Sequence, residues 1–294
     1  MPRATSADYG YLRDLVFDVS QNVLDPSRDY LFDTRLAMLL RNQGMTRVSE
    51  LVECLRACRN PALERAVAEA MTINETSFFR DSRPFELLRT ELLPRLIDAR
   101  RPVRTLRFWS AACSTGQEAY SLAMLICEHF PLLAGWELRI EGTDICGEVV
   151  ERARAGRYHR IEMNRGLPAS YRVRYFDRIG EDWIIQPEVR KLCNFRQANL
   201  CTAHFPFSRA SDRFDMIFLR NVMLYFSLET RLTLLANMHR LLIPGGILFL
   251  GSSEQPADPS QWTAFIAGGT CYFKPKASGF PTQASGARLD VAGR

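Results

Sequence analysis

The sequence contains no long apolar segment. Its longest apolar runs, among them residues 217–219 and 247–250, are far too short to span a bilayer, and the first residues lack an apolar stretch of signal-peptide length. We therefore expect a soluble protein that stays in the cytoplasm. Because 47% of the 294 residues are hydrophobic and 24% are charged, the chain can bury a core of globular size.

Paired cysteines and clustered histidines are also missing. The eight cysteines form no C-x-x-C pair and there are only four histidines, so the sequence indicates neither a zinc site nor a disulfide framework. We expect buried, reduced thiols and no metal.

A glycine-rich phosphate loop is absent as well. Residues 108–120, FWSAACSTGQEAY, indicate a buried strand, a turn of small residues and a helix, but Gly116 is the only glycine where such a loop carries two or three. Glu118, in the first helical turn, would repel a pyrophosphate. A ligand with cationic and hydroxyl groups fits better, and S-adenosylmethionine carries a sulfonium, an ammonium and a ribose diol. The alternative is a tight strand-to-helix turn capped by the glutamate.

Helical periodicity dominates the first quarter of the chain. Leucines and valines recur at helical spacing through residues 7–70, and the last of these helices begins at Asn60-Pro61, with proline in the first turn. A further helix is expected over residues 84–100. We predict a small helical domain over 1–80, a second domain over 81–276, and a disordered tail over 277–294 that is rich in serine, glycine, proline and alanine.

From residue 103 onward, apolar strands alternate with amphipathic helices. This α/β alternation predicts a doubly wound parallel sheet. The expected strands are 103–110, 137–143, 194–199, 214–219 and 246–251, and the expected helices are 116–129, 147–155 and 228–242. Residues 244–246, Pro-Gly-Gly, are expected to turn the last helix into its strand. Gly268-Gly269 indicates an edge hairpin, and the polar insert over 156–194 indicates a small β-rich subdomain.

Polar residues follow the ends of three expected strands. Because ligands of open parallel sheets bind at the carboxyl ends of the strands, these residues are candidates for a binding site. They are Asp144, Asn199 with Leu200, and Arg220 with Asn221, and Tyr225 lies shortly beyond. Asp144 stands where an acid binds ribose hydroxyls in this architecture. Each residue alone also fits a helix cap or a solvated loop, and Tyr225 fits a buried aromatic pair with Phe226.

Arginines are prominent in the helical region. The net charge is +5, and the arginines between residues 28 and 59 are Arg28, Arg35, Arg41, Arg47, Arg56 and Arg59. Such a surface can meet an acidic partner, either a nucleic acid or an acidic protein helix. A solvated helix face is the alternative.

Five motifs, in order along the chain, resemble those of the CheR-type chemotaxis receptor methyltransferases. They are N-x-T-x-F-F-R at 74–80, W-S-A-A-C-S-T-G-x-E at 109–118, G-T-D-I at 142–145, N-L at 199–200 and R-N-V-M-x-Y-F at 220–226. The resemblance covers residues from about 10 to 275. It implies an enzyme that uses S-adenosylmethionine to methylate glutamates on the helical cytoplasmic domain of chemoreceptors, tunes chemosensory adaptation, and releases S-adenosylhomocysteine. It also implies a Rossmann-like class I methyltransferase sheet with a small all-α N-terminal domain and an inserted antiparallel β-subdomain.

The resemblance further implies roles for single residues. Arg80 and Tyr225 would face the methyl group and the incoming glutamate, and Arg80 would orient its carboxylate. The residues expected to contact the cofactor are Asn74, Thr76, Arg80, Glu118, Asp144, Asn199, Leu200, Arg220 and Asn221. A glutamate carboxylate is ionised at pH 7 and needs no general base, so positioning and desolvation would carry catalysis.

The chain departs from the family pattern at some positions. Gln117 and Ala119 stand where the family often has a second acid and a proline, which leaves the strength of cofactor binding open. The segment from Tyr175 to Phe195 is short, whereas members that dock onto a receptor C-terminal pentapeptide carry a longer loop there, so we expect independence from such a tether. The arginines of the helical region match the family's basic receptor-facing surface only in general character.

Two other functions stay open at this point. One is a regulatory module that binds S-adenosylmethionine without catalysis, and the other is a methyltransferase of RNA or a small molecule. The presence of Arg80 and Tyr225 favours the enzyme. Residues 220–223 lack the Asn/Asp-Pro-Pro-Tyr/Phe turn of nucleic-acid N-methylation, so no nucleic-acid partner is expected.

Overall fold

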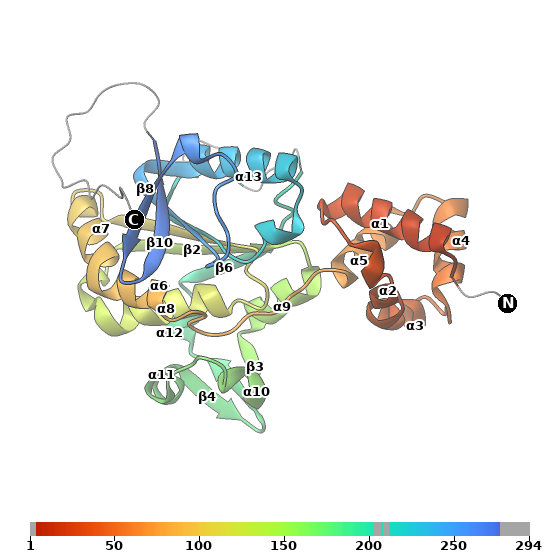
Figure 1. Cartoon of the computed structure of the whole chain (residues 1–294). Coiled ribbons are helices and arrows are strands. Elements are labelled where there is room, and N and C mark those ends of the chain that lie inside the picture. The colour runs from red at the N-terminus through yellow and green to blue at the C-terminus, as the bar shows by residue number, and fades with distance from the viewer. Residues whose placement is uncertain (1–3, 203–206, 208–211, 277–294) are drawn as a thin grey trace.

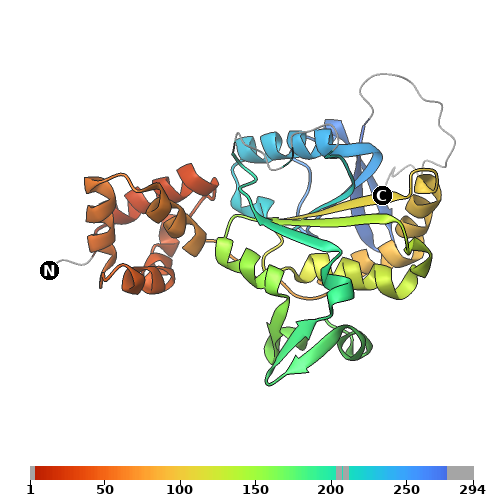
Figure 2. The same cartoon turned by 180° about the vertical axis from the view of Figure 1, so that it is seen from behind.

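The computed structural model describes residues 4–202, 207 and 212–276. A bundle of short helices stands beside a larger part built on a twisted sheet, and a small second sheet projects from that larger part (Figure 1; Figure 2 from behind). The tail predicted over 277–294 lies outside the described residues. Within the described ranges, no helix has both the length and the apolarity that a membrane crossing requires.

The N-terminal part is helical, as its periodicity predicts. Its elements are α1 (Ser6–Ser20), η1 (Pro26–Arg28), α2 (Tyr30–Arg35), α3 (Ala37–Asn42), α4 (Val48–Ala57) and α5 (Pro61–Ala70). Asn60 caps α5 by accepting a hydrogen bond from the N–H of Leu63, and Pro61 occupies its first turn. The bundle has its own apolar cluster, which extends from Leu12 to Met71.

The expectation of uniformly buried thiols is wrong for two cysteines. All eight cysteines are free, but Cys54 and Cys58 are exposed. The cause is the amphipathic pattern of α4, because Leu51 and Leu55 take its inner face and leave Cys54 on the outer one.

The single helix expected over 84–100 is interrupted. It consists of α6 (Arg83–Leu87), a π-helical turn η2 (Leu88–Leu92) and α7 (Leu93–Arg100). Pro94 has no N–H to donate to residue 90, and its ring crowds the carbonyl of that residue in an α-helix. The wider π turn just before the proline relieves this conflict.

The large sheet has seven strands and is mostly parallel. Its order is β6 (Cys193–Gln197), β2 (Glu137–Asp144), β1 (Thr105–Ala111), β7 (Phe214–Leu219), β8 (Leu242–Leu250), β10 (Thr270–Pro275) and β9 (Trp262–Ala267). Only the pairs β8–β10 and β10–β9 are antiparallel. The strand order reverses between β1 and β7, and in open sheets of this kind the ligand site lies at such a switch point. The predicted doubly wound sheet is confirmed.

The sheet is covered on both faces because side chains of its central strands alternate between two apolar clusters. In β1, Phe108 belongs to the cluster with α8 (Gln117–His129) and α9 (Gly147–Ala155), whereas Trp109 belongs to the cluster with α13 (Leu228–Leu241). Accordingly, α8 and α9 cover one face and α13 the other (Figure 1). Short turns η3 (Pro131–Leu133), η4 (Met223–Tyr225) and η5 (Pro259–Gln261) complete this part.

Several strand ends differ from the sequence expectation. β1 begins at Thr105, because Val103 is exposed in a turn and Arg104 has φ +52°. Residues 244–246 form a bulge inside β8 rather than a turn before it, since the pairing shifts between Phe214 and Met216 on the neighbouring strand. The predicted edge hairpin is confirmed, and Gly268 and Gly269 have φ +54° and +69°, as a two-residue hairpin turn requires.

The insert is a small β-subdomain, as predicted. Its antiparallel strands run in the order β3 (Arg157–His159), β5 (Asp182–Ile185) and β4 (Phe176–Ile179), with helices α10 (Arg160–Met163), α11 (Ala169–Tyr175) and α12 (Pro187–Arg190). Tyr158 is fully buried, packs edge-on against Phe78 with ring centroids 5.0 Å apart, and donates a hydrogen bond to the carbonyl of Thr115 at 2.8 Å. The subdomain therefore packs directly against two motif segments, residues 74–80 and 109–118.

Candidate active site

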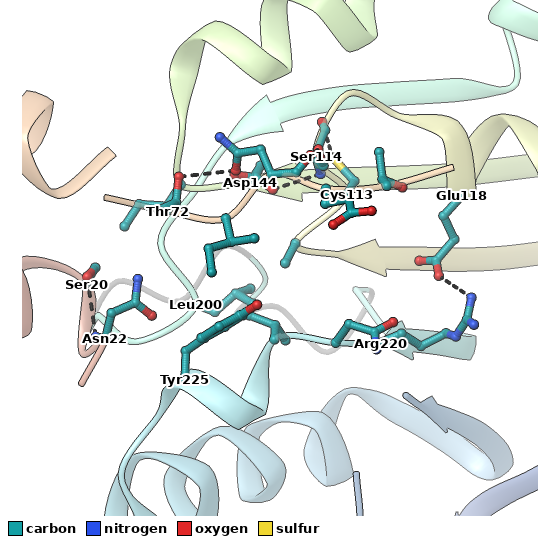
Figure 3. Close-up of a pocket in the computed structure, with 18 of the residues that line it drawn as sticks. Ser20, Asn22, Thr72, Cys113, Ser114, Glu118, Asp144, Leu200, Arg220 and Tyr225 are labelled. Carbon is teal, nitrogen blue, oxygen red and sulfur yellow. Dashed lines mark hydrogen bonds and ion pairs between the residues drawn. The ribbon is translucent and has the colours of Figure 1, made fainter. Parts of the chain in front are cut away.

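One pocket lies at the carboxyl ends of β1, β2 and β7. It holds about 910 Å³ of space that no atom fills, including the open solvent at its mouth. All ten residues that the motifs single out line it: Asn74, Thr76, Arg80, Glu118, Asp144, Asn199, Leu200, Arg220, Asn221 and Tyr225. Figure 3 shows Asp144 on one wall, Tyr225 and Leu200 on the opposite wall, and Glu118 with Arg220 at one end.

The turn after β1 is tightly folded. Ala112 and Ser114 have φ +59° and +49°, in the left-handed region, and Gly116 has φ +90°. A Cβ on Gly116 would lie 3.0 Å from the Cβ of Ala153 and 3.1 Å from Cζ of Phe195. The single glycine of the turn is therefore needed for close packing of the turn against α9 and β6.

Asp144 is a buried carboxylate, 5% exposed, at the end of β2. Its Oδ2 accepts a hydrogen bond from the N–H of Ser114 at 2.8 Å, and its Oδ1 accepts one from the N–H of Cys146 at 3.0 Å. Burial raises the pKa of Asp144, and these backbone hydrogen bonds oppose the rise. Each carboxylate oxygen can accept a further hydrogen bond, so the residue suits a ligand with hydroxyl groups.

Glu118 and Arg220 form an ion pair that the sequence analysis did not foresee. Oε1 of Glu118 accepts a hydrogen bond from the Ser110 hydroxyl at 2.7 Å, and its Oε2 accepts one from Nη1 of Arg220 at 3.0 Å (Figure 3). Nη2 of Arg220 donates to Oδ2 of Asp81 at 2.6 Å and to the carbonyl of Arg80 at 3.1 Å. One buried guanidinium thus connects the helix after the turn to the segment that carries Arg80.

The segment around Arg80 has an unusual backbone. Phe79, Asp81 and Ser82 have φ +47°, +64° and +31°, values that side-chain-bearing residues rarely adopt. Besides Arg220, the hydroxyl of Ser121 holds this segment by accepting the N–H of Phe79 at 2.9 Å. The partly exposed guanidinium of Arg80 donates to the carbonyl of Glu75 at 3.1 Å through Nη1, and its remaining N–H groups face no recorded partner among the described residues.

Tyr225 lies in η4, just beyond β7. Burial raises the pKa of the Tyr225 phenol, while the positive charges of Arg80 and Arg35 oppose the rise, so the hydroxyl is protonated at pH 7 and can donate a hydrogen bond. Arg35 reaches this region because its guanidinium donates to the carbonyls of Met71 at 2.8 Å and Thr72 at 3.3 Å. Arg35, one of the six arginines between residues 28 and 59, is thus partly buried and acts electrostatically on Tyr225.

The helical bundle supplies part of the pocket wall, which the sequence analysis missed. Ser20 and Asn22, at the end of α1, line the pocket. The side chain of Asn199 donates to the carbonyl of Val19 at 2.7 Å, and the N–H of Val23 donates to the carbonyl of Tyr225 at 2.9 Å. The other lining residues outside the predicted set are Thr72, Ile73, Glu75, Ala112, Cys113, Ser114, Ile145, Ala198, Val222 and Phe226. Most of them are immediate neighbours of motif residues, but no sequence signal marks Ser20 and Asn22.

Two buried polar atoms of the pocket wall have no hydrogen-bond partner among the described residues. They are the Nε of Arg220, a donor, and the Oδ1 of Asn221, an acceptor. Because buried polar groups are nearly always paired, these atoms indicate a polar ligand with both an acceptor and a donor. S-adenosylmethionine offers a carboxylate together with ammonium and hydroxyl groups, so the residues present fit it. Within the described ranges, no group of three or more His, Cys, Asp or Glu residues is placed to hold a metal ion.

Comparisons with known proteins agree with this chemistry. The family described as CheR methyltransferase, SAM binding domain matches residues 74–270. The chain is 41% identical over 257 residues to Chemotaxis protein methyltransferase 1 of Pseudomonas aeruginosa, covering 85% of this chain and 91% of that protein. It is 38% identical over 236 residues to Chemotaxis protein methyltransferase Cher2 of Pseudomonas putida, covering 79% and 84%. It is 39% identical over 235 residues to a chemotaxis protein methyltransferase of Vibrio parahaemolyticus, covering 79% and 83%.

Proposed function

Because this chain belongs to the CheR methyltransferase family, we propose that it methylates glutamate side chains of chemoreceptors to γ-glutamyl methyl esters. It is an S-adenosylmethionine-dependent methyltransferase, and its substrates belong to the class of chemoreceptors. The observation that carries the proposal is that all ten motif residues line one pocket. The proposed domain limits are 1–80 for the helical part and 81–276 for the methyltransferase part.

The cofactor would be held by the residues around the strand ends. Asp144 would accept hydrogen bonds from the ribose hydroxyls, and the unpaired atoms of Arg220 and Asn221 would bind the amino-acid end. The other proposed contacts are Asn74, Thr76, Arg80, Glu118, Asn199 and Leu200. Glu118 would act mainly through Arg220, since one of its oxygens already accepts from that guanidinium.

The acceptor glutamate would be oriented by Arg80 and Tyr225. Bound cofactor supplies an electrophilic methyl group: the glutamate oxygen forms the new C–O bond, the C–S bond breaks with its electron pair left on sulfur, and no proton is transferred. The guanidinium of Arg80 attracts and aligns the carboxylate, and the protonated hydroxyl of Tyr225 donates a hydrogen bond beside it. Entry into the pocket would strip water from the carboxylate, so these residues would act by positioning and desolvation, and a carboxylate that is ionised at pH 7 needs no general base.

The acidic methylation helices of the receptor are the proposed partner of the helical bundle. Arg28, Arg41 and Arg59 are exposed there and available to acidic side chains. Two other arginines have acidic neighbours within the bundle, since Arg47 pairs with Glu50 at 2.7 Å and Arg56 with Asp8 at 3.3 Å. The attraction to the receptor therefore rests mainly on Arg28, Arg41 and Arg59.

We further propose that docking does not need a receptor C-terminal pentapeptide. The strands β4 and β5 are joined by residues 180 and 181 alone, with Gly180 at φ +65°, so the β-subdomain carries no extended loop at this end. Initial methylation rates should be equal, within about twofold, for a receptor and for the same receptor lacking its C-terminal extension. A loss of about tenfold or more on truncation would contradict independence from the tether.

The proposed reaction is tested with radiolabelled S-adenosylmethionine and receptor-rich membranes from the protein's own host. We expect label on a receptor band that alkali releases as methanol, and no label with Arg80→Ala. Alkali-stable label, or label in RNA, would instead support the other methyltransferase functions. Tight binding of S-adenosylhomocysteine without any transfer would support the regulatory module.

A further inference from the structure

The turn that follows β8 carries a buried carboxylate that the mechanism above does not use. Glu254 is 6% exposed. Its Oε2 accepts the N–H groups of Gly251 and Asn221, each at 2.7 Å, and its Oε1 accepts the N–H of Met223 at 2.8 Å and that of Leu224 at 3.4 Å. Three of these four donors belong to the loop over residues 220–226, which follows β7, includes η4 and also carries the pocket residues Asn221 and Tyr225.

The local backbone explains why a carboxylate is needed. Asn221 has φ +60°, in the left-handed region, and this turn of the chain lets the N–H groups of Met223 and Leu224 reach the same carboxylate as its own. A buried charge is costly unless hydrogen bonds satisfy it, and here the loop provides them. The carboxylate and the loop therefore stabilise each other, and neither arrangement is favourable alone.

Gly251 shows independently that this contact is closely fitted. A Cβ at this position would lie 2.7 Å from Oε2 of Glu254 and 2.8 Å from Nδ2 of Asn221. The second distance places the side-chain amide of Asn221 directly against the turn. The turn therefore contacts both the side chain and the backbone of Asn221. A side chain larger than hydrogen at this position therefore requires Glu254 or Asn221 to shift.

We propose that Glu254 is a positioning residue for methyl transfer, which fixes Asn221 against the cofactor and Tyr225 against the acceptor by holding the loop that carries both. The part that concerns Tyr225 rests on the proposed function, whereas the part that concerns Asn221 requires only cofactor binding. Glu254 is not among the residues that line the pocket, and its oxygens are occupied by the loop and by Gly251, so it would act through the loop.

The test replaces the carboxylate by an amide of the same length, Glu254→Gln. One accepting oxygen becomes an NH₂ donor facing backbone N–H groups, so at least one of them loses its acceptor. We expect kcat per cofactor-binding site to fall by about 10²-fold, the size of effect that a misplacement of about 1 Å produces. We expect the Kd of S-adenosylhomocysteine to rise by about tenfold, and the KM for the receptor to change by less than about twofold.

A matched control and a second variant separate positioning from loss of fold. Glu229→Gln makes the same change at an exposed position of α13 and should behave as the unmodified protein. Gly251→Ala keeps the carboxylate but inserts a methyl group against it, and should reproduce the losses in kcat and in S-adenosylhomocysteine affinity. Partial unfolding would reduce the number of binding sites and leave kcat per site and Kd unchanged.

The proposal is overturned if both Glu254→Gln and Gly251→Ala keep kcat per site and the Kd of S-adenosylhomocysteine within about twofold of the unmodified protein. If the unmodified protein transfers no methyl group to receptors, the proposed function fails. The calorimetric Kd values of the variants then still decide whether Glu254 positions Asn221.

Discussion

Arg220→Met should destabilise the folded protein and do so mainly through Glu118. The side chain of Arg220 is 3% exposed and binds two carboxylates, those of Glu118 and Asp81. Methionine keeps the apolar stem but removes every hydrogen bond of the guanidinium. Glu118, with a side chain 14% exposed, is then left without its cation.

The expected magnitude follows from the geometry. At 3.0 Å from Glu118, an effective dielectric constant of about 20 gives an attraction of about 5 kcal/mol, which desolvation of the guanidinium largely offsets. Asp81 lies closer, at 2.6 Å, but its side chain is 43% exposed, so water screens this pair and it adds little. Removing one partner of such a buried pair costs about 3 kcal/mol, which corresponds to a fall in Tm of about 6–12 °C for a domain of this size.

A double-mutant cycle isolates the pair. The variants are Arg220→Met, Glu118→Gln and the double variant, compared by urea denaturation followed by circular dichroism in the absence of cofactor. Glu118→Gln should cost about 1 kcal/mol, because its amide oxygen can still accept the Ser110 hydroxyl. The loss in free energy of unfolding of the double variant should be smaller, by about 1–2 kcal/mol, than the sum of the losses of the two single variants. Additive effects, within about 0.5 kcal/mol, would refute the assignment of Glu118 as the main partner.

Three further changes test other parts of the site. Arg80→Ala should abolish methyl transfer, which the radiolabel assay measures. Its Tm in scanning calorimetry should stay within about 2 °C of the unmodified protein, because the Arg80 side chain makes one hydrogen bond, from Nη1 to a carbonyl. Asp144→Ala should weaken binding of S-adenosylhomocysteine by about 30–100-fold in calorimetry, the equivalent of losing a hydrogen bond to a charged group, and an unchanged Kd would remove Asp144 from the cofactor site. Because burial raises the pKa of the six other thiols, they are protonated at pH 8, and a disulfide reagent should react rapidly only with the exposed Cys54 and Cys58 until the protein unfolds.

The parts of the site that the sequence predicts are those encoded locally. Asp144 and Arg220 follow buried strands, and parallel strands bring their carboxyl ends to one edge of the sheet, so alternation and motif spacing suffice to place them together. The Gly268-Gly269 hairpin is predictable for the same reason, because a two-residue turn with positive φ favours glycine.

Other parts depend on contacts between distant segments. Ser20 enters the pocket only because the chain just after α1 pairs with Tyr225 and Phe226, and nothing in the residues around Ser20 marks that approach. The left-handed backbone of Ala112 and Ser114 is equally hidden, since neither residue favours positive φ and tertiary contacts impose it. Glu254 was overlooked because a single acidic residue after a strand is an ordinary feature of a loop, and its donors lie about thirty residues away.

The wall that α1 contributes to the pocket has a practical consequence for dividing the chain. The match to the SAM binding domain begins at residue 74, yet Ser20 and Asn22 line the same cavity as Asp144 and Tyr225. An expression fragment cut at that boundary would open the cavity along one side and leave the carbonyl of Tyr225 and the amide of Asn199 without their partners. The matched domain is therefore smaller than the part of the chain that encloses the pocket, and truncation or fusion should respect the latter.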